Sequence, residues 1–116
     1  AIHALSHPTG AMYNTHHGTT NAVYMPAVLE LNAPEIADRF DMAAAYLGIS
    51  GGFKGFQSFV QDFNDNLGIP RKLSDMGVDD QQLDEMVRQA LADPSCGGNP
   101  VELTAENTRQ LFIDCI

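Results

Sequence analysis

The chain has 116 residues, a length that fits one domain with a single core of modest size. Six basic and fifteen acidic residues give a formal net charge of −9, which argues against nucleic acid and anionic membranes as partners because both need a basic surface. Two cysteines, Cys96 and Cys115, are too few for a disulfide scaffold, so we expect free thiols and a cytoplasmic protein.

Apolar residues recur at helical spacing, and no segment alternates as a strand does. The sequence therefore predicts an all-α helical bundle. We expect one helix over residues 19–33, with a threonine at position 19 or 20 as its N-cap and a kink at Pro26. Pro34 is expected to begin a second helix, with Gly48 as its C-cap.

The second half of the chain predicts four further helical segments. A phenylalanine stripe follows Gly51 and Gly52 and predicts a helix whose stripe belongs to the core: Phe53, Phe56, Phe59 and Phe63. Residues 73–78 predict a short helical turn closed by Gly77. An aspartate at position 79 or 80 is expected to cap a helix over residues 83–91, and Thr104 to cap the last helix with Asn107 in the capping-box position.

All four histidines fall within the first seventeen residues: His3, His7, His16 and His17. No formally charged residue precedes Glu30. A segment that is polar through imidazole, hydroxyl and amide groups suits the wall of a buried site better than a solvated surface. Imidazole is also the commonest transition-metal ligand, so the segment is a candidate metal site.

The spacing permits two metal-binding pairs. His3 and His7 are four residues apart, so both rings lie on one face if the segment is helical, although Pro8 biases His7 away from helical backbone angles. His17 could join His3 only if the chain turns back, because fourteen residues of straight helix span about 21 Å. Either pair is two ligands short of a four-coordinate site, and the histidines could instead be structural.

The segment closely resembles the metal-binding motif of the iron-containing (group III) alcohol dehydrogenases. The motif is approximately H-x-[LM]-[AS]-H-P-x-G-x-x-[YF]-x-x-x-H-G-x-x-N-A, and the matching residues are His3, Leu5, Ser6, His7, Pro8, Gly10, Tyr13, His17, Gly18, Asn21 and Ala22. The resemblance continues through Leu67–Pro70, Gly77-Val78 and Gly97–Pro100 and so spans essentially the whole chain. Two positions depart from the family: His16 stands where proline is usual, and Thr9 where an apolar residue is common.

The resemblance implies a dehydroquinate synthase-like C-terminal helical domain over residues 1–116, within a longer enzyme. It implies His3 and His17 as ligands of Fe²⁺, or of Zn²⁺, and His7 as a catalytic residue beside the nicotinamide of NAD(P). The remaining two ligands, an Asp and a His, and the N-terminal nucleotide-binding domain of the family are absent from this sequence. The chain alone should therefore be inactive.

The implied reaction interconverts a small alcohol and an aldehyde or ketone. We also expect a homo-oligomer, because the surface left without its partner domain should be apolar. The alternative function is a stand-alone metal-binding or interaction domain without catalysis.

Overall fold

The computed structural model describes all 116 residues. It contains five α-helices, two short 3-10 helices and no strand, which confirms the predicted all-α fold. The elements in chain order are α1 (Ile2–Tyr13), α2 (His17–Leu47), α3 (Gly52–Asn66), η1 (Leu73–Met76), α4 (Leu83–Ala92), η2 (Pro94–Gly98) and α5 (Ala105–Cys115). None of the helices combines the length and hydropathy needed to cross a lipid bilayer.

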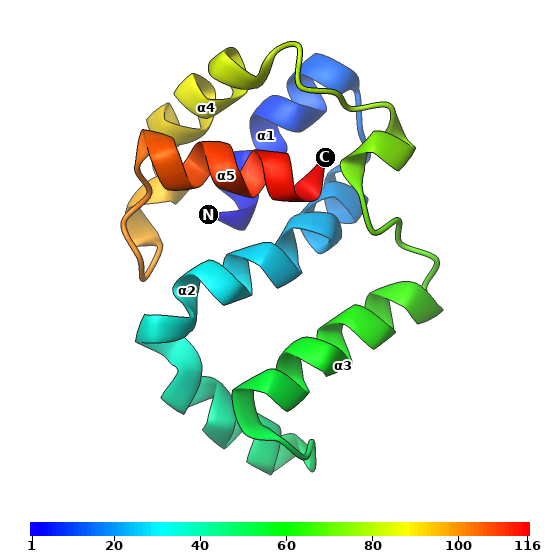
Figure 1. Cartoon of the computed structure of the whole chain (residues 1–116), viewed down its shortest axis with the longest axis vertical. Helices are drawn as coiled ribbons and strands as arrows, with labels where there is room; N and C mark the ends of the chain where they lie inside the picture. The colour runs from blue at the N-terminus through cyan, green and yellow to red at the C-terminus, as the bar shows by residue number, and fades with distance from the viewer.

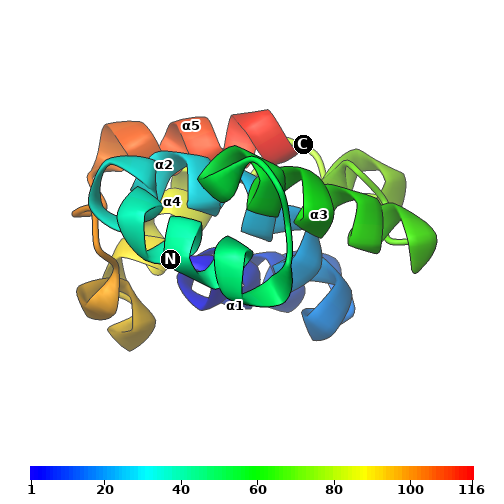
Figure 2. The same ribbon diagram turned by 90° about the horizontal axis from the view of Figure 1, so that it is seen from below.

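The helices form a bundle with an arm. α1, α4, α5 and the first half of α2 surround the main core, whereas α3 and the second half of α2 extend away from it (Figure 1). Seen from below, α5 and α1 lie on opposite sides of the molecule (Figure 2). The candidate site residues of α1 therefore lie on the bundle and not on the arm.

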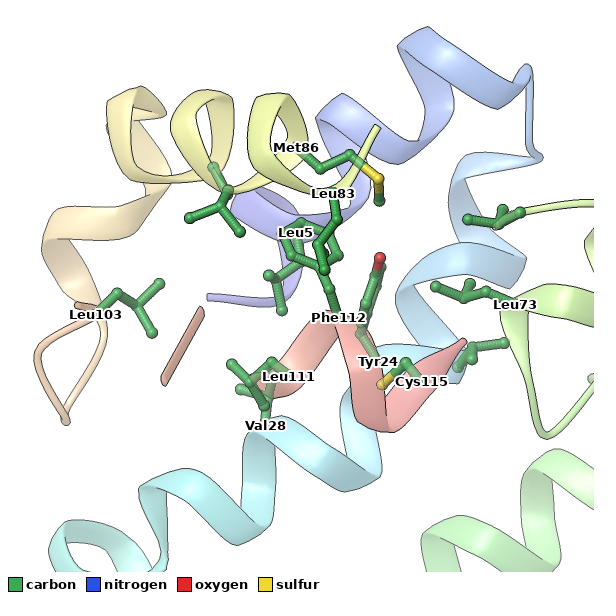
Figure 3. Packing of buried hydrophobic residues seen from close by; sticks show 14 residues of the cluster. Leu5, Tyr24, Val28, Leu73, Leu83, Met86, Leu103, Leu111, Phe112 and Cys115 are labelled. Carbon is green, nitrogen blue, oxygen red and sulfur yellow. The ribbon is translucent and has the colours of Figure 1, made fainter. Parts of the chain in front are cut away.

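The main core joins apolar side chains from all the helices of the bundle and from η1 (Figure 3). At its centre the rings of Tyr24 and Phe112 meet edge to face, with centroids 5.9 Å apart. The hydroxyl groups of Tyr24 and Thr9 lie 2.8 Å apart, which satisfies a polar atom that would be costly to bury alone. Burial raises the pKa of Tyr24, so its hydroxyl stays neutral.

α2 differs from the two helices that the sequence predicted. It begins at His17, runs through Pro26 and Pro34 without ending, and stops at Leu47 before Gly48. Its N-cap is His16, whose Nδ1 accepts the Thr19 N–H, so a cap at position 19 or 20 was wrong. A proline bends a helix without ending it where packing supports both sides, and Figure 1 shows α2 changing direction in its middle.

The phenylalanine stripe of α3 is only partly core, which corrects the prediction. Phe53 is buried, but Phe59 is 45% exposed and Phe63 is 53% exposed. α3 packs mainly against α2, so helical periodicity identified an apolar face that is wider than the contact with α2.

The helix ends predicted in the second half of the chain are confirmed in part. Gly77 closes η1 with a φ of 82°, as predicted. Thr104 and Asn107 form the predicted capping box of α5. α4 begins after Gln82, so a cap at Asp79 or Asp80 was wrong; the Asp79 carboxylate instead accepts the Gln81 N–H and the Tyr13 hydroxyl. Cys96 and Cys115 are free thiols, as expected.

Candidate metal and substrate site

α1 presents His3 and His7 on its exposed face. The opposite face packs into the bundle through Ala4, Leu5, Ser6, Pro8 and Thr9. Pro8 lies inside the helix, so the expected bias of His7 away from helical geometry did not end α1. The four-residue spacing therefore places the two imidazole rings next to each other, with centroids 5.8 Å apart.

A turn after α1 brings His17 to the same place. Asn14 ends α1 in the left-handed conformation, with a φ of 53°, and α2 begins at His17. The His17 ring lies 5.2 Å from the His3 ring and 5.5 Å from the His7 ring, centroid to centroid. The structure thus brings three of the four histidines together. The rings are adjacent in both predicted metal pairs, His3 with His7 and His3 with His17.

The fourth histidine has a different role. The ring of His16 caps α2, with Nδ1 accepting the Thr19 N–H at 3.3 Å and lying 3.1 Å from the Thr19 hydroxyl. All four imidazoles are exposed in this chain. The expectation of a buried wall is therefore not met by residues 1–116, because the histidines lie on the outer faces of α1 and α2.

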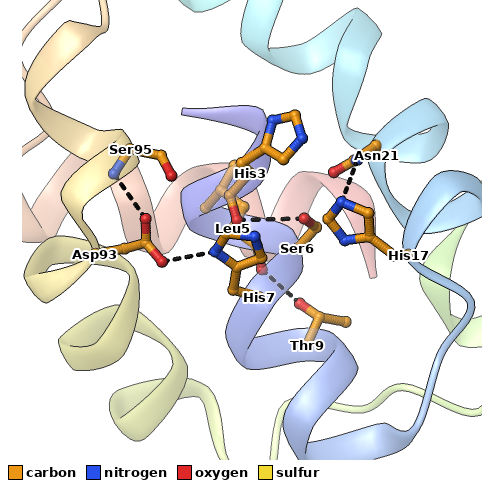
Figure 4. Close-up of polar contacts among 9 residues, drawn as sticks. All are labelled: His3, Leu5, Ser6, His7, Thr9, His17, Asn21, Asp93 and Ser95. Carbon is orange, nitrogen blue, oxygen red and sulfur yellow. Dashed lines mark hydrogen bonds and ion pairs between the residues drawn. The ribbon is translucent and has the colours of Figure 1, made fainter.

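The three clustered imidazoles differ in their hydrogen bonds (Figure 4). His7 Nδ1 lies 2.7 Å from the Asp93 Oδ2, and Asp93 Oδ1 accepts the Ser95 N–H at 2.8 Å. Hydrogen bonding from Ser95, then from His7, lowers the pKa of Asp93 to about 2. The carboxylate is therefore ionised at neutral pH.

His17 has an amide neighbour. Its Nε2 lies 3.0 Å from Asn21 Nδ2, and because an amide nitrogen only donates, Nε2 accepts and is unprotonated. The Oδ1 of Asn21 is buried without a hydrogen-bond partner in the chain. Figure 4 draws no hydrogen bond to the His3 ring. The His3 ring makes no hydrogen bond within the chain, whereas a metal ion on His17 Nε2 would have to displace the Asn21 amide.

The chemistry of this donor set fits a divalent transition metal in part. Neutral imidazoles suit iron and zinc, and no lysine or arginine lies in this segment to repel a cation. However, no three histidine, cysteine, aspartate or glutamate side chains of the chain are arranged to hold a metal ion by themselves. The three clustered histidines can supply donors for only part of a coordination shell.

The match to known proteins decides the family. Residues 1–115 match the model of the Fe-containing alcohol dehydrogenase family, C-terminal region. The chain belongs to this family.

Relatives in the family are oxidoreductases of alcohols and aldehydes. Lactaldehyde reductase of Escherichia coli (strain K12) is 32% identical over 118 residues, which cover 96% of this chain and 31% of that protein. 4-Hydroxybutyrate dehydrogenase of Cupriavidus necator is 36% identical over 120 residues, with the same coverage. The chain thus spans about a third of the length of these relatives.

Solved structures of the family share the fold. A crystal structure of 1,3-propanediol oxidoreductase superposes with a TM-score of 0.91 at 26% identity, over 99% of this chain and 32% of that one. An iron-containing alcohol dehydrogenase from Thermococcus thioreducens superposes with a TM-score of 0.86 at 29% identity, over 98% of this chain and 31% of that one. Both confirm the predicted resemblance to the helical region of iron-type alcohol dehydrogenases.

Sequence reasoning missed two polar neighbours of the histidines, Asn21 and Asp93. Asn21 stands in the family motif, four residues after His17, so helical spacing could have placed it beside that ring. Asp93 precedes a proline and a serine, which is a capping signal for η2. The contact between Asp93 and His7 joins residues 86 positions apart, so no local sequence pattern could predict it.

Proposed function

We propose that this chain is the metal-holding helical part of an NAD(P)-linked oxidoreductase that interconverts a small alcohol and an aldehyde or ketone. The observation that carries the proposal is the convergence of His3, His7 and His17, three motif residues of the family, at one place on α1 and α2. The chain's membership of an oxidoreductase family supports the class of reaction.

We assign His3 and His17 as ligands of Fe²⁺, with Zn²⁺ as the second candidate. Their rings are adjacent, with centroids 5.2 Å apart, and the unprotonated Nε2 of His17 would exchange its hydrogen bond from Asn21 for the ion. When bound, such an ion supplies a Lewis acid that lowers the free energy of an alkoxide. The two further ligands, an Asp and a His in the family, would come from residues outside this chain.

His7 is the proposed catalytic residue of the chain. It lies between the metal-ligand pair and Asp93, and its Nδ1 is engaged by the carboxylate. The other ring nitrogen, Nε2, faces the side of His17 (Figure 4). From there it would orient a substrate hydroxyl group or accept its proton, on the side where the resemblance to the family implies the nicotinamide would bind.

The proposal assigns the binding of NAD(P) to a nucleotide-binding domain that works with residues 1–116. The relatives are about three times as long as the chain, which leaves room for such a domain in a protein of their length. We further propose that the working protein is a homo-oligomer. The exposed rings of Phe59 and Phe63 support a contact with another protein surface.

Isolating the natural gene product and measuring its mass and activity tests the proposal. An antibody raised against this chain would be used to isolate the protein from its source cells, followed by mass determination and an assay of NAD(P)H-linked reduction of short aldehydes. We expect a product about three times the 12.6 kDa of the chain whose activity is lost on chelation and restored by Fe²⁺. A product of 12.6 kDa without activity would contradict the proposal in favour of a stand-alone domain.

A further inference from the structure

Asp93 links the loop after α4 to the exposed face of α1. Its side chain is 14% exposed and lies 2.7 Å from Nδ1 of His7, whose own side chain is 46% exposed. Both carboxylate oxygens are engaged, because Oδ1 accepts the Ser95 N–H while Oδ2 faces His7. The position of Asp93 is set by η2, of which it is the N-cap.

We propose that Asp93 is a positioning residue that fixes the tautomer and the orientation of His7. The Nδ1–H group of His7 donates to Asp93 Oδ2, which leaves Nε2 unprotonated on the side of His17 (Figure 4). The inference rests on the proposed catalytic role of His7. It adds that the carboxylate of Asp93, 86 residues after His7, determines which ring nitrogen of His7 performs that role.

For a neutral His7, the hydrogen-bonding chemistry permits only this arrangement. An ionised carboxylate accepts hydrogen bonds and has no proton to donate, so Nδ1 of a neutral His7 must be the donor. Asp93 is ionised at neutral pH because its hydrogen bonds hold the carboxyl pKa near 2. The ring is also held in place, since the carboxylate is itself oriented by the Ser95 N–H.

The substitution Asp93→Asn reverses the predicted tautomer while keeping the cap. The asparagine Oδ1 can still accept the Ser95 N–H, which places the NH₂ group against Nδ1 of His7. Nδ1 must then accept, and the proton of the neutral ring moves to Nε2. The nitrogen facing His17 changes from an acceptor to a donor.

Long-range ¹H–¹⁵N correlation spectra of the histidine-labelled chain measure this directly. Spectra are recorded near pH 9, where imidazoles with an ordinary pKa of about 6.5 are neutral, and a His7→Gln variant assigns the His7 signals. We expect the unprotonated nitrogen of His7 to be Nε2 in the wild-type chain and Nδ1 in the Asp93→Asn variant.

Asp79→Asn is the matched control. Asp79 also accepts a backbone N–H two residues later and a side-chain donor, but that donor is Tyr13 and not a histidine. The control should leave the His7 tautomer unchanged. A purely structural role of Asp93 would leave the tautomer unchanged in both variants.

Two outcomes overturn the inference. One is a wild-type His7 with its proton on Nε2, which needs no variant and holds even if Asp93→Asn fails to fold. The other is a folded Asp93→Asn chain with an unchanged tautomer. Neither result bears on metal binding by His3 and His17, so failure of the inference and failure of the proposed function are separate observations.

Discussion

The hydroxyl groups of Thr9 and Tyr24 lie 2.8 Å apart in the interior of the bundle and join α1 to α2. Thr9 also donates to the Leu5 carbonyl at 2.8 Å, so its oxygen accepts the Tyr24 O–H. This pair lies beneath the exposed face that carries His3 and His7. It therefore helps to hold α1 and α2 in the arrangement that unites the three imidazoles.

Removing the Tyr24 hydroxyl and removing the Thr9 hydroxyl should lower the unfolding free energy by different amounts. Tyr24→Phe leaves Thr9 donating to Leu5 and should cost about 1 kcal/mol of unfolding free energy. Thr9→Val leaves the buried Tyr24 hydroxyl without a partner and should cost more, about 1–3 kcal/mol. Urea denaturation of the two single variants and the double variant measures this, and a larger loss for Tyr24→Phe would contradict the described hydrogen-bond directions.

The exposed rings of α3 should contribute to association more than to folding. Phe59→Ala and Phe63→Ala should each change the unfolding free energy by less than about 1 kcal/mol, whereas Phe53→Ala, in the small α2–α3 core, should cost about 3 kcal/mol. Sedimentation velocity should show weaker self-association in the Phe59 and Phe63 variants only. Equal destabilisation by all three substitutions would mean that the outer rings are also packed.

The lowered pKa of Asp93 predicts that the folded chain loses stability in acid. The folded-state pKa of Asp93, about 2, lies below the value of about 3.9 in an unfolded chain. A lowered carboxyl pKa gives stability that is fully present above about pH 4 and is lost as the pH falls towards 2. Thermal unfolding midpoints between pH 2 and 5 should therefore fall less steeply for Asp93→Asn than for Asp79→Asn, and identical slopes would argue against the lowered pKa of Asp93.

A second contact holds the loop that carries Asp93. The side-chain amides of Asn32 and Asn99 exchange hydrogen bonds of 2.9 Å and 2.7 Å, and Asn32 Oδ1 also accepts the Val101 N–H at 3.2 Å. Asn32 is buried, so Asn32→Leu should cost about 1–3 kcal/mol by leaving these donors unpaired. Hydrogen exchange of the Val101 amide should accelerate in this variant, while Asn21→Leu should leave it unchanged.

The sequence predicted the fold class and most helices, because apolar periodicity and capping residues are local signals. It failed at Pro34, where tertiary packing keeps α2 continuous, and at Phe59 and Phe63, where periodicity does not say which part of an apolar face has a neighbour. For the site, the sequence singled out the three histidines that the structure brings together, whereas spacing alone left two metal-binding pairs open. The contact between His7 and Asp93 depends on how the bundle closes and has no local signal.

Metal titration of the chain tests the central claim most directly. Co²⁺ serves as the spectroscopic probe, and His3→Ala, His17→Ala and His16→Asn are compared, since Asn retains the N-cap of α2. The proposed ligand pair predicts that His3→Ala and His17→Ala each weaken Co²⁺ binding and that His16→Asn does not. Binding that survives loss of His3 or His17, or that depends on His16 instead, would contradict the assignment of this chain as the metal-holding part of the enzyme.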